Sequence, residues 1–372
     1  MMKKAGLLIS TISIALMAIL LGCKKYPDFV GTPYRGASEN FRVDTDLKVF
    51  QKGVTTNTVN FTTNGAAYFE ATFSEKVNWY LNITSPDNGA SITFTGVTNR
   101  IDSNVVKWYG GHDSEKFFRP GTKAIATLSF LNSKIVTRDT FNIASFANFP
   151  KTLTVFDFDN TVPTAQILNF AGTGQDFLGT VVNDPAFANH GLNYLRMTGT
   201  DLTNGFYIGG YRRTWPNTGA LTQFYARTFN LTPLSSDTIK PEDLYVNMLI
   251  YSFFDEPGFG SGGQTNQDLC KINITFNEDD NKNGSHTPQN EDGFTMQIPV
   301  NWRRGWRLVS FPYSSFARET NVNFGGNGNN KKETYKIKEI TVGLLSAPSG
   351  GRVTAAVDYL VFSYKQPLNL KQ

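Results

Sequence analysis

The stretch AYFEATF at residues 67–73 alternates apolar and polar side chains, and NWYLNI at residues 78–83 repeats the pattern. Successive side chains of an extended strand point to opposite faces of a sheet, so this alternation predicts strands with one face on a core. Similar short segments recur from residue 41 to residue 149, about seven in all, which is typical of an immunoglobulin-like β-sandwich. Trp79 and Trp108 lie within such segments and are predicted to be core residues.

The composition favours the same fold class along the rest of the chain. The 372 residues include 30 Phe, 15 Tyr and 33 Gly, and only 18% of them are charged. Aromatic and β-branched residues suit half-buried strands, whereas Gly and Asn suit the turns between them. Long helical patterns are missing, so the sequence predicts an all-β protein.

A second β domain is expected after a short joint at Pro150 and Lys151. Eight or nine strand-like segments with long polar loops between them predict a larger β-jelly roll over residues 153–366. The segments are VFDFDN (155–160), LNYLRM (192–197), GFYIGGY (205–211), LYVNMLIY (244–251), CKINITF (270–276), FTMQIP (294–299), WRLVSFP (306–312), EITVGL (339–344) and AAVDYLVF (355–362).

The N-terminal residues have the pattern that an export signal would have. Lys3 and Lys4 precede an apolar run, residues 5–21, which ends in Leu-Leu-Gly before Cys23. This arrangement resembles the lipobox of bacterial lipoproteins, and it implies a signal peptide over residues 1–22 and fatty acylation, such as palmitate, on Cys23. Several acyl chains on one cysteine would anchor the protein durably. The alternative is a membrane-spanning helix, although the run is marginal for a span of about 20 residues.

Residues 23–40 contain several Pro and Gly residues among polar ones and are predicted to form a flexible tether. Removing residues 1–22 would take away two lysines and lower the formal charge from +4 to +2. A charge so near zero gives no reason to expect nucleic acid as a partner. Cys270 is the only other cysteine, so an internal disulfide is not expected once Cys23 is acylated.

The second domain resembles the galactose-binding-like jelly rolls that serve as carbohydrate-binding modules. The resemblance is carried by FDFD at 156–159, GLNYLR at 191–196, GWRLVSFPYSSF at 305–316 and VDYLVF at 357–362. In that family the first and last strands lie side by side and often share a structural calcium ion. The resemblance therefore implies Ca²⁺ bound by Asp159 and Asp358, with Asp157 as a further candidate. The alternative is that these acids face solvent.

A second acidic segment, EDDNKNG at residues 278–284, matches the first half of an Asp-x-Asn-x-Asn-Gly calcium loop. Position twelve of that motif should be Glu but is Asn290, and Glu291 follows one residue later. The alternative is that this segment forms the polar tip of a hairpin between strands that end at Phe276 and begin at Phe294.

Sugar recognition needs flat aromatic faces with polar groups around them. The candidate ligand-binding residues are Trp215 with Tyr211, Arg212 and Arg213, and Trp302 with Arg303 and Arg304, because both tryptophans fall in loop-like stretches. Trp306 begins a strand and is predicted to be core. Packing is the alternative role for each of these residues.

The motifs of common enzymes are missing. His112, His190 and His286 have no metal-ligand spacing, and neither Gly-x-Ser-x-Gly nor His-Glu-x-x-His occurs. The sequence does not predict an enzyme.

The whole chain resembles bacterial surface glycan-binding lipoproteins, the accessory binders of starch-utilisation-type uptake systems. The resemblance implies an outer-membrane lipoprotein, lipid-anchored at the cell surface, that binds a poly- or oligosaccharide for a neighbouring transporter. One alternative is a non-catalytic structural subunit of an outer-membrane barrel complex. A lyase or hydrolase on a jelly roll is the other.

Overall fold

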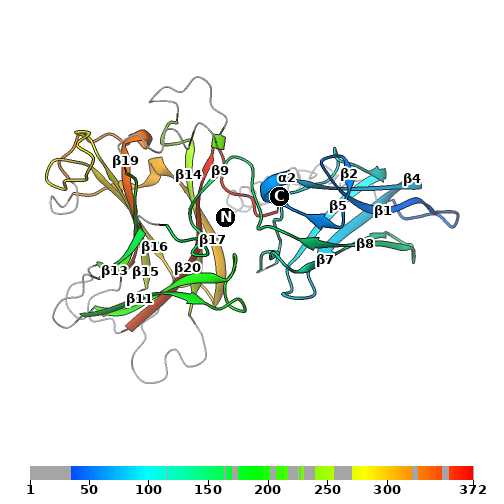
Figure 1. Cartoon of the computed structure of the whole chain (residues 1–372), viewed down its shortest axis with the longest axis horizontal. Helices are drawn as coiled ribbons and strands as arrows, with labels where there is room; N and C mark the ends of the chain where they lie inside the picture. Colours follow the sequence, from blue (N-terminus) through cyan, green and yellow to red (C-terminus); the bar gives the residue numbers. More distant parts are fainter. Residues whose placement is uncertain are drawn as a thin grey trace, which may run out of the picture.

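The computed structural model describes residues 35–114, 116–162, 165–169, 175–201, 207–216, 225, 228–229, 239–254, 270–320, 326–345 and 352–371. Strands dominate these residues, so the predicted all-β class is confirmed. Figure 1 shows two β-rich bodies next to each other, which we call the first module (strands β1 to β8) and the second module (strands β9 to β20). Cys23 and the predicted signal peptide lie outside the described residues.

The first module consists of one eight-stranded sheet and a short helical turn. Its order is β2-β1-β4-β7-β8-β3, with β5 and β6 also paired to β4. The elements are β1 (Val43–Gln51), β2 (Val54–Thr55), β3 (Thr58–Val59), α2 (Phe61–Asn64), β4 (Ala67–Thr84), β5 (Ser91–Ile101), β6 (Lys107–Trp108), β7 (Lys123–Phe130) and β8 (Val136–Ile143).

Strand β4 organises this module because it is long enough to serve two sets of neighbours. Its first part pairs with β1 and β6, its last part pairs with β7, and β5 pairs with residues of both parts. Its alternate side chains are buried, as the sequence pattern predicts. Trp79 and Trp108 are 1% and 0% exposed, which confirms both as core residues. Trp108 packs edge-on against Phe118 at a ring-centroid distance of 4.8 Å.

Residues 35–38 belong to the folded module, so the prediction of a tether as far as residue 40 is wrong for them. The Arg35 amide donates to Asn78 Oδ1 at 2.7 Å, and the Ser38 amide donates to Glu75 Oε1 at 2.7 Å. The Ala37 amide donates to the Leu131 carbonyl at 2.8 Å. In these bonds the backbone amides of residues 35–38 pair with partners far away in the chain instead of with water. The Pro- and Gly-rich composition of the segment does not reveal such partners, so it did not predict where the tether ends.

The second module contains two six-stranded sheets. We call the sheet β10-β13-β19-β15-β16-β18 the distal sheet, and the sheet β11-β12-β20-β14-β17, with β9 paired to β20, the proximal sheet. The strands are β9 (Thr152–Phe156), β10 (Ala165–Asn169), β11 (Gln175–Asn183), β12 (Asn193–Asp201), β13 (Tyr207–Thr214), β14 (Leu244–Ser252), β15 (Lys271–Glu278), β16 (Gly293–Pro299), β17 (Gly305–Pro312), β18 (Ala317–Arg318), β19 (Ile337–Leu345) and β20 (Arg352–Tyr364); two 3-10 turns are η2 (Tyr313–Ser315) and η3 (Thr334–Lys336).

The outer face of the proximal sheet is turned toward the first module. Phe117 and Phe149 of the first module form one buried cluster with Leu249 of β14 and Tyr359 of β20. The C-terminal segment joins this cluster through Leu368. In Figure 1, β9, β14 and β17 accordingly lie on the side of the second module that is nearer to the first. Among the described residues, no helix has the length and apolar character needed to cross a membrane.

The side chain of Phe276 offers a test of the second module's core. It is fully buried and contacts Tyr313 at a ring-centroid distance of 4.8 Å and Phe316 at 5.0 Å. The change Phe276→Ala should lower the free energy of unfolding by about 3–5 kcal/mol, measured by urea denaturation, because it leaves a cavity. Leu178→Ala is the control: this side chain is 61% exposed, and its loss should cost less than about 0.5 kcal/mol. Equal losses in the two variants would contradict this core.

Candidate functional site

Polar side chains gather on the outer face of the distal sheet. The core-facing residues of β15 are Ile272, Ile274 and Phe276, so the residues between them point away from the core. Strand register extends this face over β13, β16 and β19. We call the resulting group the polar strip; it consists of Arg212, Asn273, Thr275, Asn277, Thr295, Gln297, Glu339 and Thr341.

Strand pairing places the members of the polar strip in rows across the sheet. Arg212 lies opposite Thr341, Thr341 opposite Thr275, and Thr275 opposite Thr295. Hydroxyl and amide groups connect neighbouring rows: Thr295 Oγ1 donates to Asn273 Oδ1 at 2.7 Å, and Asn273 Nδ2 donates to Thr275 Oγ1 at 2.9 Å. Side chains held in this way present their remaining hydrogen-bonding atoms in a fixed pattern.

One end of the polar strip carries charge. Arg212 Nη1 lies 3.6 Å from Glu339 Oε2, and the two side chains are 30% and 12% exposed. Asn277 Nδ2 donates to Glu339 Oε1. Within the part of the chain that the structure describes, the buried atoms Arg212 Nε and Asn277 Oδ1 have no hydrogen-bond partner. A donor and an acceptor left unsatisfied here are suited to a polar ligand or to water.

The predicted ligand residues Tyr211, Arg213 and Trp215 lie on the opposite face of β13. Trp215 is only 3% exposed and belongs to the core of the second module, so it has the packing role that was the alternative to ligand binding. The three positions alternate with Arg212, and the side of the sheet that they share faces the core. The ring of Trp215 is therefore not available to a sugar.

Tyr211 and Arg213 have packing partners inside the sandwich. The Tyr211 ring meets Phe156 at 4.9 Å, and Arg213 Nη1 donates to the Val155 carbonyl. Burial raises the pKa of Tyr211 and lowers the pKa of Arg213. Trp302 is half-buried: it packs against the same core, and the Arg307 guanidinium carbon lies 5.3 Å from its ring centroid.

An aromatic cluster that the sequence analysis missed lies on the outer face of the proximal sheet. Phe187 is at its centre, with ring-centroid distances of 4.5 Å to Tyr251, 4.7 Å to Tyr194 and 5.7 Å to Trp306. Trp306 Nε1 donates to the Phe187 carbonyl at 3.0 Å. Trp306 is thus packed, as predicted, but against a loop on the outside of the sheet rather than between the sheets.

Two of the three predicted calcium ligands share a buried environment. Asp358 is 0% exposed, and its Oδ2 accepts from the amides of Asn189 and His190 at 3.1 and 2.8 Å. Asp159 Oδ1 accepts from the amides of Leu192 and Asn193 at 2.8 and 3.0 Å. The other oxygen of each carboxylate, Asp159 Oδ2 and Asp358 Oδ1, is buried with no hydrogen-bond partner in the described chain.

Asp159 Oδ2 and Asp358 Oδ1 are the two oxygens that this pair offers to a hard cation such as Ca²⁺, and Asp159 Oδ2 also lies 3.8 Å from His190 Nδ1. Burial, followed by the charge of Asp159, raises the pKa of Asp358 well above its usual range. Burial also raises the pKa of Asp159. Burial lowers the pKa of His190 to about 3, so its imidazole supplies no positive charge. Two buried carboxylates with free oxygens are stabilised by a metal ion, and oxygen ligands are those that Ca²⁺ prefers.

Asp157 is the exception among the predicted ligands. Its two oxygens accept from the backbone and the side-chain amide of Asn160, at 3.1 and 2.7 Å. Strand β9 ends at Phe156, and Phe158 has a positive φ of 57°. The strand alternation that would place Asp157 and Asp159 on the same face is therefore interrupted. The structure therefore gives Asp157 a turn-forming role.

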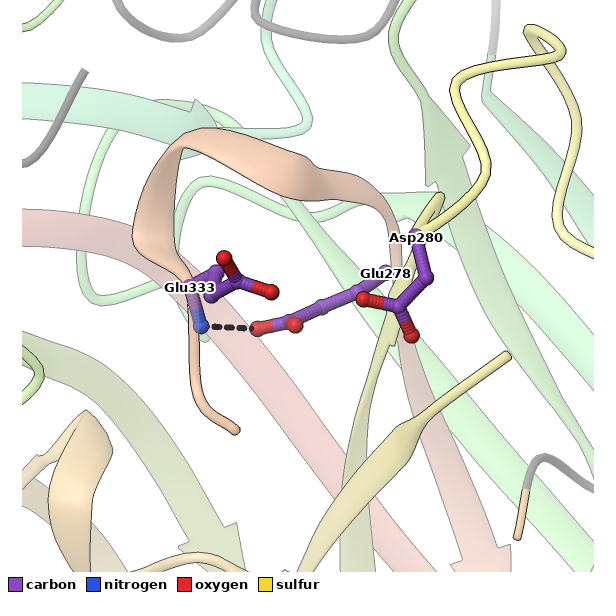
Figure 2. A group of neighbouring side chains, drawn as sticks. All are labelled: Glu278, Asp280 and Glu333. Carbon is purple, nitrogen blue, oxygen red and sulfur yellow. Dashed lines mark hydrogen bonds between the residues drawn. The ribbon is translucent and has the colours of Figure 1, made fainter. Parts of the chain in front are cut away.

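A third group of acids comes from the hairpin between β15 and β16. Figure 2 shows the carboxylate of Glu278 between those of Glu333 and Asp280. The backbone amide of Glu333 donates a hydrogen bond to Glu278 Oε1 at 2.7 Å. One oxygen from each of the three lies within 4.8 Å of the others, which is close enough to hold a metal ion. The ammonium of Lys336 already lies 3.3 Å from Asp280 Oδ1 and 2.5 Å from Glu333 Oε2. This cluster thus contains its own cation.

The rest of this hairpin differs from the polar tip that the sequence predicts. Strands β15 and β16 do pair as a hairpin. At its base, however, Asp279 and Glu291 are both 0% exposed. Asp279 accepts from the amides of Asn283 and Gly284 at 3.0 and 2.9 Å, as in the first half of a calcium loop. Hydrophobic alternation ends at Phe276, so the pattern did not predict the burial of these acids.

The chain is therefore a protein of two β modules, the second of them a two-sheet sandwich with a polar outer face. No protein-family model matches it, and no curated protein matches it. Among solved structures it is similar to the family 11 carbohydrate-binding module of the cellulosomal cellulase Lic26A-Cel5E of Clostridium thermocellum, with 14% identity, a TM-score of 0.37 and coverage of 58% of this chain and 96% of that chain.

Two further solved structures are carbohydrate-binding modules. The family 30 module of the cellulosomal cellulase CEL9D-CEL44B of Clostridium thermocellum has 15% identity and a TM-score of 0.31, and the match covers 58% of this chain and 98% of that chain. TmCBM61 in complex with β-1,4-galactotriose has 10% identity and a TM-score of 0.23, and the match covers 52% of this chain and 90% of that chain. Likenesses at this level assign neither a ligand nor a site residue.

The buried carboxyl of Glu278 predicts a pH-dependent stability. Burial raises its pKa from 4.5 to about 9. The folded state then binds the proton more tightly than the unfolded state, so this stabilisation is complete below pH 4.5 and is lost as the pH rises through 9. Glu278→Gln should flatten the fall in Tm between pH 5 and pH 10, a fall equivalent to at most about 1.4 kcal/mol per pH unit.

The matched control is Glu242→Gln, because Glu242 is exposed. This variant should keep the slope of the parent protein in the same melting experiment. An unchanged slope in Glu278→Gln would mean that Glu278 is ionised in the folded state, contrary to the prediction.

Proposed function

We propose that the second module binds a poly- or oligosaccharide along the polar strip of the distal sheet. The observation that carries this proposal is the ordered set of amide, hydroxyl, guanidinium and carboxylate groups on one sheet face, with Arg212 Nε and Asn277 Oδ1 left without partners. Sugar hydroxyls are donors and acceptors at once, so they complement such a set. The proximal sheet is less suited, because the first module contacts its outer face.

The polar strip favours recognition by hydrogen bonds over stacking. Its members are Arg, Asn, Gln, Glu and Thr side chains, and Trp215 is buried on the other side of the sheet. Trp302 is half-buried and remains a candidate contact at the end of β16. The role we propose is capture of a glycan rather than catalysis on it.

We also propose that acylation of Cys23 anchors the chain at the outer membrane, with the glycan-binding face at the cell surface. The support is the lipobox-like Leu-Leu-Gly-Cys at residues 20–23 after an apolar run. A neighbouring uptake transporter is the partner that this location suggests. The first module would then hold the polar strip away from the membrane.

A structural subunit of an outer-membrane complex is the second candidate function. One observation favours it: the edge strand β11 exposes Leu178 and Val181, at 61% and 40%. An exposed apolar edge strand can pair with another chain. Pull-down from detergent-solubilised membranes would support this candidate if a stoichiometric barrel protein were recovered and if Leu178→Lys abolished its recovery.

Affinity electrophoresis tests the glycan proposal. Gels containing mixed-linked β-glucan, xylan, galactan, starch or pectin should retard the protein in at least one case. Arg212→Ala and Asn277→Ala should each weaken that retardation about tenfold or more, because each removes a hydrogen bond to a charged or fixed polar group. Thr198→Ala, on the outer face of the proximal sheet, is the matched control. Retardation by none of the five glycans, or equal retardation of all variants, would contradict the proposal.

The anchoring proposal has its own test. Expression of Cys23→Ser in a Gram-negative host should move the protein from the membrane pellet to the soluble exported fraction, because the thiol that receives the lipid is gone. The parent protein should release only with detergent. A parent protein that is soluble without detergent, or a mature N-terminus other than residue 23 by mass spectrometry, would overturn it.

A further inference from the structure

A recess opens on the surface of the first module, which so far has no role in ligand binding. Its volume is about 340 Å³, and we call it the first-module recess. Small-molecule sites in proteins have volumes of roughly 300–1,000 Å³, so the recess is large enough for a small ligand. The residues that line it include Phe50, Lys52, Tyr68, Glu70, Asn104 and Lys107.

Strand pairing places three of these residues in one row across the sheet. Tyr68 of β4 lies opposite Phe50 of β1 on one side and opposite Lys107 of β6 on the other. The adjoining residues Val49 and Phe69 are fully buried in the core of the first module. Strand alternation therefore turns the row away from that core. Both of its aromatic rings are half-buried and offer a flat apolar face to a ligand.

A tight turn at the rim of the recess presents Lys52. The φ angles of Lys52 and Gly53 are 52° and 78°, and the two residues connect Gln51 of β1 to Val54 of β2. Two-residue turns with positive φ at both positions favour Asn or Gly, because the Cβ of other residues crowds the backbone. The lysine is thus unfavourable for the turn itself, while it places an ammonium group at the recess.

A second turn, residues 102–106, is organised by Asp102. Its carboxylate accepts from the Asn104 amide at 2.9 Å and lies 3.0 Å from Arg100 Nε. Its carbonyl accepts from the amides of Val105 and Val106 at 3.0 and 3.1 Å. The charge of Asp102 is therefore used within the turn and by Arg100, and the side chain of Asn104 remains to line the recess.

The first-module recess has an excess of positive charge. Lys52 and Lys107 contribute two ammonium groups, and Glu70 contributes one carboxylate. Over the described part of the chain, none of these three side chains forms an ion pair. Lys48 lies opposite Glu70 in the pairing of β1 with β4 and adds a further positive charge nearby. An anionic ligand would therefore meet unpaired cations beside two aromatic faces.

We propose that the first-module recess binds an anionic sugar, a pyranose ring with a carboxylate or sulfate group, as a second glycan site. The apolar face of the ring packs on Tyr68, and the acidic group pairs with Lys52 and Lys107. Hydroxyl groups of the sugar bond to the polar side chains of Glu70 and Asn104. The proposal does not depend on the polar strip, because that strip lies in the other module.

Titration calorimetry on the chain from residue 24 onward tests this site with three tetrasaccharides: galacturonate, sulfated galactan and neutral galactan. At least one anionic probe should bind about tenfold or more tightly than the neutral probe, because only the anionic probes pair with the two lysines. Raising NaCl from about 50 to about 300 mM should weaken this binding several-fold, since salt screens exposed charges. The anionic probe that binds more tightly identifies the acidic group.

Two variants locate the binding in the recess. Lys107→Gln removes a cation at an exposed position and should weaken binding of the anionic probe about fivefold or more, and Tyr68→Ala should weaken it about tenfold. Lys123→Gln makes the same charge change elsewhere on the first module, at another exposed position. Tyr80→Ala removes a second tyrosine of β4, which is 40% exposed. Both control variants should bind as the parent does.

Arg212→Ala separates this site from the polar strip. It should leave the affinity for the anionic probe within about twofold of the parent value, because the two sites are far apart in the molecule. Binding of neither anionic probe, or equal binding of the neutral probe, would overturn the proposal. Loss of binding in Arg212→Ala but not in Lys107→Gln would place the anionic sugar on the polar strip instead, and would equally overturn the recess.

Discussion

Strand β20 is buried on both of its faces, and the arrangement of the rest of the second module depends on this. Eleven consecutive residues of the strand, from Val353 to Ser363, are buried. One face of a central strand is always covered by the core of the sandwich, but the second face needs another cover. Here Phe117 and Phe149 of the first module and the C-terminal segment cover Tyr359 and Val361. Ala188, Tyr194 and Phe253 of the second module cover Ala356. The two modules are therefore connected by packing as well as by the chain.

The outer faces of the two sheets differ in what covers them. The first module contacts the outer face of the proximal sheet at β14 and β20, whereas amides, hydroxyls and an ion pair occupy the outer face of the distal sheet. Asp358 lies in the middle of β20, the strand that is buried on both faces. Burial of its carboxylate is unfavourable unless its oxygens are hydrogen-bonded. The amides of Asn189 and His190 donate to one of its oxygens, and the carbonyl of Asn189 accepts from the amide of Phe117 in the first module.

The resemblance to galactose-binding-like jelly rolls pointed to Asp159 and Asp358. The structure places both acids on amides of the segment that joins β11 to β12, and calcium binding by them stays a prediction. Trp215 was predicted to fall in a loop-like stretch because it precedes a proline, although it continues the inward side of β13. The signal for the polar strip in the sequence is that Asn273, Thr275 and Asn277 alternate with apolar residues along β15. Ordinary solvent-facing strand residues give the same alternation, so the pattern alone does not mark a site.

The sequence by itself determined the all-β class, the strands with clear alternation and the burial of Trp79 and Trp108, because a period of two is a local property of the chain. Only the tertiary structure decided which face of each sheet is covered. Alternation separates side chains into two sets but does not say which set meets a neighbour, and that neighbour comes from residues far away in the chain. Such long-range packing decides the burial of Trp215, Glu278 and Glu291 and the packing of Trp306 against Phe187. It also decides the contact of Lys116 with the carbonyls of residues 186–188.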